Sequence, residues 1–324
     1  MLKGKPRTPW SLTSLRASVA RLPRSRIIFA VLLAIFFLVL TSHRFASYKM
    51  NTTVWEKAPI NDIERVCPDT GYRVIEKKED AGKICITTLT DAKKADPLQK
   101  MLRWRNFNSL LDMTWPNKES YAKKHGYYLF DESDSLDTTR PPSWSKIKAA
   151  QRLLNEENCD WVFWLDADTV VMNSAKTIEA FLPADKAKDL LITSQKGGSY
   201  NAGAWLIRNS EWSREFLDHW WNMKDFVKPK GLSVSGDNDA LKAYLLGLDK
   251  EDFNAHILVP PRCTFNSVTV FLSPQEAASL SPERVKDQEY YMHLEKYHKG
   301  DLIAHVAGKN NKIDTTALLL KDAV

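Results

Sequence analysis

The feature that most constrains the fold is an apolar run, Trp161 to Leu165, in which polar and apolar residues do not alternate. A strand of this kind is covered on both faces, which is typical of a sheet with helices packed on either side. Two carboxylates, Asp166 and Asp168, follow the run directly. Because burying an unpaired carboxylate is costly, the end of this strand predicts a site that neutralises both of them.

Strand-like and helix-like segments alternate along the chain on both sides of this run. Strands are expected over residues 83–90, 160–168, 189–195, 202–209, 255–261 and 301–308, with a short one after Gly126. Helices are expected over residues 97–111, up to Gly126, and over 141–158, 175–183, 210–226 and 237–248, with Ser210 as an N-cap. This order predicts an α/β sheet that binds ligands at the carboxyl ends of its strands.

The positive charge of the chain is concentrated at its N-terminus. Nine of the 46 Lys and Arg residues lie in the first 50 positions, and no acidic residue precedes Glu56. The remainder is nearly neutral, which disfavours nucleic-acid binding. The basic residues precede an uncharged run, so we expect a cytoplasmic tail (1–26), a transmembrane signal anchor (27–43) and a lumenal stem (44–82). A cleaved signal peptide and a mitochondrial presequence are the alternatives.

The cysteines and one sequon bear on the compartment. The four cysteines are widely spaced and form no C-x-x-C motif, which disfavours a zinc site. One or two disulfides are compatible with the sequence, in any of the three full pairings, and buried free thiols remain the alternative for Cys85 and Cys159. Asn51 begins the one N-x-S/T sequon, which suits a lumenal position.

The aspartate pair has a metal-binding interpretation. Asp166 and Asp168 share a face if the strand continues, and a turn just after Leu165 also brings them together. Carboxylate oxygens suit Mg²⁺ or Mn²⁺, which usually keep positions for water and phosphate. As an alternative, the pair caps the next helix. A second alternative is a haloacid-dehalogenase-type phosphatase with Asp166 as nucleophile, but about 80 residues of α/β chain precede the motif.

The wider context resembles a known family. The segments "YAKKHGYYLF", "SWSKIKAAQRLL", "DWVFWLDADTVVMN", "YNAGAWLIRNSEWSREFLDHWW", "GDNDAL" and "GDLIAHVAG" occur in this order. Together they resemble family 34 glycosyltransferases, the galactosyl-, mannosyl- and xylosyltransferases of fungi and plants, over roughly residues 83 to 310. The resemblance implies a GT-A fold, which is a Rossmann-like mixed sheet flanked by helices. It also implies nucleotide-sugar donors, Mn²⁺ (or Mg²⁺), retention of anomeric configuration and a Golgi type II membrane protein.

The resemblance assigns roles to individual residues. It implies a metal site made of Asp166, Asp168 and His305, in which Asp168 contacts the ion and Asp166 also meets the ribose or a metal-bound water. Asp237 and Asn238 take the catalytic position, where the family commonly has an acidic residue followed by the longer Gln. The implied donor-binding residues are Thr87, Thr88, Trp144, Lys146, Asp166, Asn201, Ala202, Gly203, Gly308 and Lys309. The family's Cys after the Gly is missing here, so Lys312 is an alternative to Lys309 as the basic residue beside the diphosphate.

These observations give one functional hypothesis and two competitors. We expect a catalytic domain over residues 83–313, followed by a C-terminal tail over 314–324. The domain is expected to move a galactosyl or mannosyl group, with xylosyl as a further option, from UDP-Gal, GDP-Man or UDP-Xyl to a glycan hydroxyl in the Golgi. A homo- or hetero-oligomer is compatible with this hypothesis. The competitors are the phosphatase and a catalytically inert subunit of a Golgi glycosyltransferase complex.

Overall fold

The computed structural model describes residues 67, 69–91, 109–195, 199–229, 235–269, 297–308 and 312–324, all within one unit, Pro59–Val324. The strands are β1 (Ile84–Thr88), β2 (Tyr128–Asp131), β3 (Trp161–Leu165), β4 (Thr169–Val171), β5 (Leu190–Gln195), β6 (Ser199–Arg208), β7 (Ile257–Leu258), β8 (Ser267–Val268) and β9 (Ile303–His305). The helices are α4 (Leu110–His125), α5 (Ser145–Asn155), α6 (Glu211–Asn222), α7 (Asp237–Gly247), α8 (Lys250–His256) and α11 (Lys312–Asp322).

The main sheet has six strands in the order β2-β1-β3-β6-β5-β7. Neighbouring strands are parallel except at β6, which is antiparallel to both β3 and β5. The amino end of β6 therefore lies at the same edge as the carboxyl ends of β1 and β3. This mixed sheet flanked by helices confirms the coarse α/β architecture expected from the sequence.

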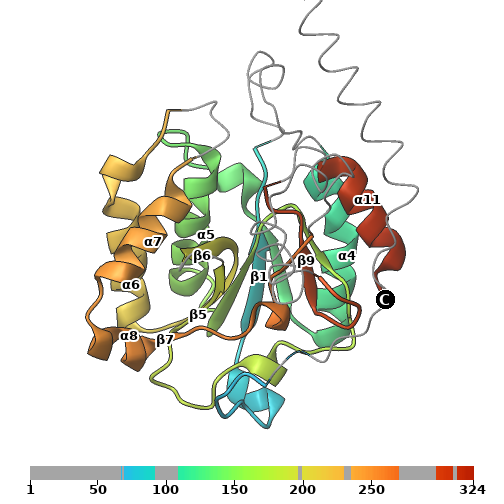
Figure 1. Cartoon of the computed structure of the whole chain (residues 1–324), viewed down its shortest axis with the longest axis horizontal. Helices are drawn as coiled ribbons and strands as arrows, with labels where there is room; N and C mark the ends of the chain where they lie inside the picture. Colours follow the sequence, from blue (N-terminus) through green and yellow to red (C-terminus); the bar gives the residue numbers. More distant parts are fainter. Residues whose placement is uncertain are drawn as a thin grey trace, which may run out of the picture. The chain divides into compact units, whose positions relative to one another are not determined.

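Helices cover both faces of the main sheet. Figure 1 shows α5, α6 and α7 on one side of it, and α4 and α11 on the other. In β3, Val162 and Trp164 pack into the core cluster that includes α5 and α6, whereas Trp161, Phe163 and Leu165 pack into the opposite one. Coverage on both faces is the reason that β3 lacks alternation.

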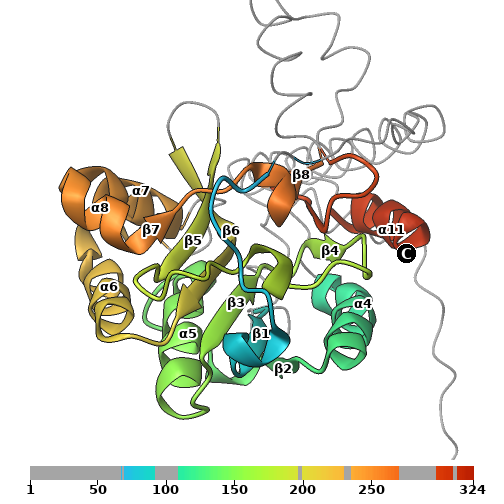
Figure 2. The same ribbon diagram turned by 90° about the horizontal axis from the view of Figure 1, so that it is seen from below.

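A second sheet extends the molecule beyond the aspartates. It has three strands in the order β4-β9-β8. Figure 2 shows β4 beside α4, with which it is in contact. Because β4 begins only four positions after β3 ends, the chain leaves the main sheet through the Asp166–Asp168 segment and joins the second sheet at once.

All four cysteines are paired, as Cys67–Cys263 and Cys85–Cys159. The alternative of buried free thiols at Cys85 and Cys159 is therefore wrong. Residue type alone left this open, because a free cysteine and a disulfide occupy the same apolar surroundings.

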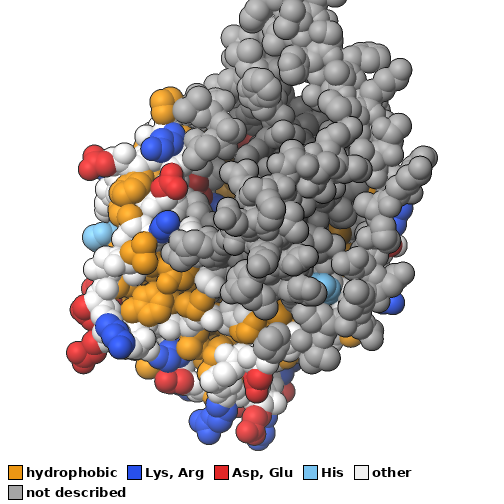
Figure 3. Space-filling view, viewed as in Figure 1, with side chains coloured by type: hydrophobic (Ala, Val, Ile, Leu, Met, Phe, Trp, Pro, Cys, Tyr) orange, Lys and Arg blue, Asp and Glu red, His pale blue; other side chains and the backbone are white. Residues whose placement is uncertain are grey.

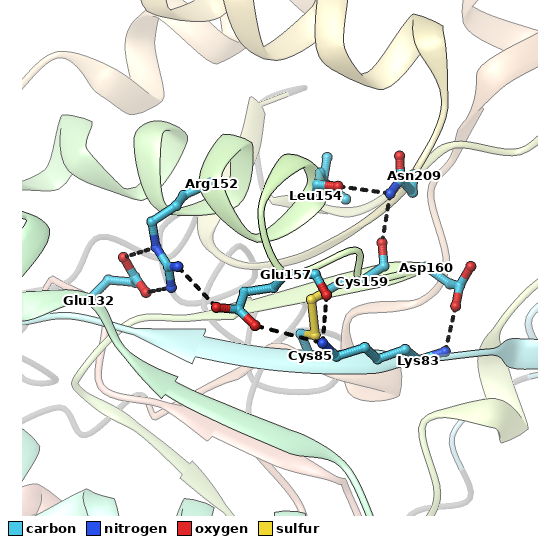
Figure 4. The surroundings of a disulfide bond; sticks show 9 residues. All are labelled: Lys83, Cys85, Glu132, Arg152, Leu154, Glu157, Cys159, Asp160 and Asn209. Atoms are coloured by element: carbon cyan, nitrogen blue, oxygen red, sulfur yellow. Dashed lines mark hydrogen bonds and ion pairs between the residues drawn. A yellow bond between two sulfur atoms is a disulfide. The ribbon is translucent and has the colours of Figure 1, made fainter.

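The Cys85–Cys159 bond lies at the amino edge of the main sheet, within the polar network of Figure 4. The side chain of Asn209 donates a hydrogen bond of 3.0 Å to the Cys159 carbonyl, and the amide of Lys83 donates one of 2.6 Å to Asp160. These bonds tie the starts of β1 and β3 together, at the edge opposite the aspartate pair.

Two helix predictions differ from the structure. The helix expected over residues 175–183 is wrong, because only a single 3-10 turn, Glu179–Phe181, forms there. Its polar main-chain groups bond outward instead: the Ile178 amide donates to the hydroxyl of Tyr127 (2.9 Å), and the Leu182 carbonyl accepts from Ile75. Most of the helix expected over residues 97–111 lies outside the described residues, and α4 begins near its end, at Leu110.

Other helix boundaries follow the sequence closely. The amide of Ser213 donates to the Ser210 hydroxyl (3.1 Å), so Ser210 is the N-cap of α6 as predicted. Helix α4 ends at His125, and Gly126 adopts a left-handed conformation with φ +73°, which favours glycine.

Several terminal predictions lie partly or wholly beyond the described part of the chain. The basic tail, the 27–43 anchor and Asn51 all lie outside it. Among the described residues, no helix combines the length and the apolar character needed to span a bilayer. In the segment expected as a stem, Val74 pairs with Pro183, and most of the expected C-terminal tail forms α11.

Helix α7 has apolar side chains on more than one side. Ala240, Leu241 and Leu245 are buried, whereas Leu246 is 61% exposed. Figure 3 shows apolar side chains gathered over the region of α7, α8 and β7. Helix α7 thus packs on the sheet and also contributes to an apolar area of the surface.

Candidate metal centre

The aspartate pair lies in a turn, and β3 does not continue through it. The amide of Asp166 still donates to the Gly203 carbonyl (2.8 Å), which extends the pairing with β6 by one bond. The amide of Thr169 then donates to the Asp166 carbonyl (3.1 Å) and closes a four-residue turn. Of the two geometries compatible with the sequence, the turn just after Leu165 is the one observed.

His305 reaches this turn from the second sheet. In the antiparallel pairing of β4 with β9, His305 stands opposite Thr169. Its Nε2 atom lies 3.4 Å from Oδ1 of Asp168 and 3.9 Å from Oδ2 of Asp166. One potential ligand atom from each of the three residues lies within 4.8 Å of the others, so the structure brings together the metal ligands that the resemblance implied.

The second carboxylate oxygen of each aspartate is held by other side chains. Oδ1 of Asp166 accepts hydrogen bonds from Trp164 Nε1 (2.7 Å) and Lys146 Nζ (3.1 Å). Oδ2 of Asp168 accepts one from Lys312 Nζ, which also donates to a carbonyl in the same region. In each carboxylate the other oxygen faces His305.

The orientation of His305 is fixed by Asn266. The amide nitrogen of Asn266 donates to Thr193 Oγ1 (3.0 Å) and Asn201 Oδ1 (3.2 Å), so its Oδ1 points to Nδ1 of His305 at 3.0 Å. An acceptor at this position places the proton of a neutral imidazole on Nδ1 and leaves the lone pair of Nε2 toward the aspartates. This is the tautomer that a metal ligand requires.

The charge state of the carboxylates follows from their neighbours. Burial on its own raises the pKa of Asp168, but the positive charge of Lys312 and the contact with His305 outweigh it and hold the pKa well below its usual range. For Lys146, burial acts to lower the pKa, whereas Asp166 and Asp237 raise it above the ordinary value. The turn thus presents the ionised carboxylate of Asp168 to the point between the three side chains.

Asp237 and Asn238 lie at the start of α7 with their side chains engaged. Asp237 is buried, with Oδ2 3.2 Å from Lys146 Nζ, and the Ser235 hydroxyl donates to its other oxygen. Asn238 accepts from the Ala202 amide (2.7 Å) and donates to the Tyr200 carbonyl (3.0 Å). Asp237 therefore connects through Lys146 to Asp166, and Asn238 holds the main chain of β6.

Residues 200–203 lie near the start of β6, at the edge of the sheet where β3 ends and Asp166 and Asp168 follow. Oδ1 of Asn201 accepts from the Gly203 amide (2.9 Å), so this atom faces the protein. The Ala202 carbonyl accepts from Lys146 (2.9 Å). Gly203 lies directly against His305, and a Cβ atom there would overlap the imidazole ring. A glycine at this position is what allows β6 and His305 to approach each other.

The remaining predicted donor-binding residues are spread around the same edge. Thr87 and Thr88 end β1, and their buried hydroxyls have no hydrogen-bond partner among the described residues. Trp144 is fully buried and donates from Nε1 to the Ser235 carbonyl (2.9 Å). Gly308 has φ +70° and open space beside it, and Lys309 lies outside the described residues.

Some residues of this site were not predicted. Asn266 belongs to no motif, and its role appears only once β5, β6 and β9 are assembled. Trp164 was expected to be a core residue, and it is buried, but its indole also holds Asp166. Thr114 and Lys118 of α4 donate hydrogen bonds to main-chain carbonyls of the turn Asp166–Thr169, which is called the metal turn below. A helix that ends before Gly126 was predicted, but no motif in the sequence pointed to these two side chains.

Fold and site together describe an α/β protein with a candidate divalent-metal centre at the carboxyl edge of its sheet. The chain belongs to the galactosyl transferase GMA12/MNN10 family, whose model matches residues 80–188 and 177–315. This match confirms the family resemblance seen in the sequence motifs.

Individual relatives support the same assignment. The chain is 29% identical over 246 residues to the "Probable alpha-1,6-mannosyltransferase MNN10" of Saccharomyces cerevisiae. The aligned region covers 65% of this chain and 58% of that protein. It is 30% identical over 170 residues to "Galactomannan galactosyltransferase 1" of Cyamopsis tetragonoloba, covering 44% of this chain and 38% of that protein. The chain thus spans less than two thirds of the length of these relatives.

Among solved structures, a glycosyltransferase involved in the glycosylation of the major capsid of PBCV-1 gives a TM-score of 0.47 at 16% identity. The superposition covers 74% of this chain and 99% of that one.

Proposed function

We propose that this protein is a metal-dependent, retaining glycosyltransferase that moves a hexosyl group from a nucleoside-diphosphate sugar to a glycan hydroxyl. One observation carries the proposal. Asp166, Asp168 and His305 direct one polar atom each to a common point, while every other polar atom of these side chains is held by the protein. Anchored carboxylate and imidazole ligands are how metal sites are built.

The donor set fits Mn²⁺ or Mg²⁺, which accept carboxylate oxygens, and the imidazole favours Mn²⁺ of the two. Such an ion, when bound, offsets negative charge on the diphosphate of the departing nucleotide. The residues of the chain surround that position. Lys312 and Lys146 supply fixed positive charge, Thr87 and Thr88 offer hydroxyls at the end of β1, and Gly203 leaves room for the ring of His305.

The arrangement of α7 favours same-face attack over a covalent glycosyl-enzyme. Asp237 is paired with Lys146 and Ser235, and both polar atoms of Asn238 bond to β6, so neither is poised as a nucleophile. In same-face attack an oxygen of the donor diphosphate takes the acceptor proton, and no protein base is needed. A glycosyl adduct found by mass spectrometry, on Asp237 or on another carboxylate in the Asp237→Asn variant, would contradict this mechanism.

The donor is proposed to be UDP-galactose or GDP-mannose, with UDP-xylose as a further option. The relatives named for mannosyl and galactosyl transfer support the first two. The phosphatase hypothesis is weaker, because one oxygen of Asp166 is occupied by Trp164 and Lys146. An inert subunit is disfavoured by the complete set of anchored ligands.

For the location we propose a type II protein of the Golgi membrane, with the described unit in the lumen. The basic tail and the apolar run at residues 27–43 support this orientation. The two disulfides suit an oxidising compartment. Protease protection of the described unit in sealed Golgi vesicles tests this, and digestion without detergent would reject it.

The decisive experiment is a donor screen on the purified protein with Mn²⁺, with and without glycan acceptors, read as nucleotide release. We expect turnover of one hexosyl donor, its loss in EDTA and recovery on adding Mn²⁺. Asp166→Asn is the variant of choice, since Asp166 is only partly buried and Lys146 keeps Asp237 as a partner. It should abolish turnover, whereas Asp239→Asn, at an exposed carboxylate of α7, should not. Turnover that persists in EDTA, or none with any donor, would reject the proposal.

A further inference from the structure

The face of α4 that points to the metal turn carries polar side chains. Thr114, Asn117, Lys118 and Tyr121 follow one another at helical spacing, so they share this face. Thr114 and Lys118 are fully buried. A helix that packs on a protein interior usually turns apolar residues inward. The polar residues on the inner face of α4 therefore call for a specific partner.

That partner is the main chain of the segment that contains the aspartates. The hydroxyl of Thr114 donates to the Ala167 carbonyl (2.8 Å), and Nζ of Lys118 donates to the Thr169 carbonyl (2.7 Å). The side chain of Asn117, on the same face, donates a hydrogen bond to the Val171 carbonyl (2.9 Å) and accepts one from the Val171 amide (2.8 Å).

These contacts complete the support of the metal turn. The Asp166 carbonyl accepts from Thr169, within the turn, and the Asp168 carbonyl accepts from the Val306 amide (3.0 Å) of the β9 segment. The other two carbonyls of this segment belong to Ala167 and Thr169. Both accept hydrogen bonds from side chains of α4. All four successive carbonyls are thus held, two of them by side chains of one helix.

Fixing these carbonyls fixes the aspartates. Ala167 is the residue between Asp166 and Asp168, and a rotation of its peptide plane changes the separation of the two carboxylates. Thr169 stands opposite His305 in the β4–β9 pairing, so Lys118 acts on the register of the third ligand as well. A bound ion needs ligand positions reproducible to a few tenths of an ångström, which two buried hydrogen bonds can impose.

We propose that Thr114 and Lys118 are positioning residues of the metal centre, which hold the Asp166–Thr169 turn in its metal-binding shape from behind. The inference rests on the proposed metal dependence and adds to it a determinant of affinity outside the ligands. Neither side chain needs to touch the ion, the donor or the acceptor for this role.

The test compares two substitutions that each remove one hydroxyl from α4. Thr114→Val keeps the side-chain shape and deletes the bond to Ala167. Tyr121→Phe deletes the bond from Tyr121 to the Lys176 carbonyl (2.9 Å), seven residues beyond the turn. Mn²⁺ binding is titrated by electron paramagnetic resonance on the full chain, and the melting temperature of each metal-free variant is recorded beside it.

We expect Thr114→Val to weaken Mn²⁺ binding on the order of tenfold, the range seen for groups that support metal ligands. Tyr121→Phe should bind Mn²⁺ as the wild type does, even where its melting temperature falls by as much as that of Thr114→Val. Equal affinities in the wild type and Thr114→Val overturn the inference and leave the proposed metal dependence standing. An equal loss in Tyr121→Phe also overturns it, since that result means general loosening of α4. A wild type that binds no Mn²⁺ overturns both.

Discussion

Gly203 is the position at which the smallest change reaches the candidate metal centre. It pairs β6 with the turn through its carbonyl, and its α-carbon faces His305 so closely that a Cβ atom would overlap the ring. We predict that Gly203→Ala displaces His305 and lowers Mn²⁺ affinity at least tenfold, comparable with the loss of a supporting group. Isothermal titration with Mn²⁺ measures this.

The matched control is Gly247→Ala, at the last residue of α7, where a Cβ atom would meet nothing within 4 Å. This substitution should leave Mn²⁺ affinity unchanged and stabilise the fold slightly, because alanine costs less conformational entropy in a helix. A Gly203→Ala variant with wild-type affinity would show that His305 adapts without loss.

Lys118 gives a prediction about pH. Burial lowers its pKa from an ordinary 10.5 to about 7, although Asp168 and Asp166 act in the opposite direction. Between these two values the unfolded chain binds more protons than the folded one, so stability contributed by this site rises with pH. With metal chelated, the free energy of unfolding should increase by about 2 kcal/mol more in the wild type than in Lys118→Met between pH 7 and pH 9.

Urea denaturation of both proteins at several pH values provides the measurement. Methionine matches the length of the lysine and carries no charge, so subtracting its curve removes the titration of other groups. Parallel curves for the two proteins would mean that Lys118 keeps its charge in the folded state.

At the level of single residues, the sequence singled out the three candidate ligands that the structure brings together, but not the residues that hold them. Asp166, Asp168 and His305 were found because their residue types suit a metal and their surroundings resemble a family. Asn266 and Thr114 are ordinary polar residues in loop and helix. Their roles follow from three-dimensional proximity across 39 and 53 positions of sequence, to His305 and Ala167 respectively, and no local pattern encodes it.

Among the elements, prediction worked where packing alone decides the conformation. β3 is apolar throughout and buried on both faces, so its identity was readable, but it ends at Leu165, before the end of the strand expected over residues 160–168. The segment at residues 175–183 has a helical pattern, but its amides and carbonyls bond to Tyr127 and Ile75 of other elements. The end of α4 before Gly126 was predicted, but its start at Leu110 was not, and Pro116 lies inside the helix.

The disulfide between β1 and the turn before β3 is the clearest element-level contribution to stability. Cys85 and Cys159 are 74 positions apart, and closing a loop of that length restricts the unfolded chain. The double variant Cys85→Ala/Cys159→Ala should lose about 2–4 kcal/mol of unfolding free energy. Its Mn²⁺ affinity should remain that of the wild type, because the bond lies at the edge opposite the aspartates.

Urea denaturation under non-reducing conditions measures the stability, and titration with Mn²⁺ measures the affinity of the same samples. A variant that keeps its stability would show that local packing holds β1 and β3 together. A variant that keeps its stability but loses the metal would place the disulfide in the organisation of the site.

For the whole molecule, alternation of strands and helices was enough to predict an α/β sheet, and the topology required the structure. The reversed direction of β6 is the key example. A sequence pattern shows where a strand lies but not which way it runs, and that direction decides whether Gly203 meets His305 or lies at the far edge. The second sheet was not predicted as a sheet: β9 lies within the strand expected over residues 301–308, but β4 and β8 are only three and two residues long and were not expected.

The separation of Asp168 from Lys312 by 144 positions has a consequence for biosynthesis. A ribosome delivers Asp166 and Asp168 early and His305 and Lys312 much later, while folding proceeds from the N-terminal side. Lys146 precedes Asp166 in the chain and can pair with it early, but Asp168 has neither the imidazole of His305 nor the charge of Lys312 until β9 and α11 have emerged. The three residues of the candidate metal centre thus come together only once nearly the entire described unit has been synthesised, and a translation product that ends before His305 should lack this centre.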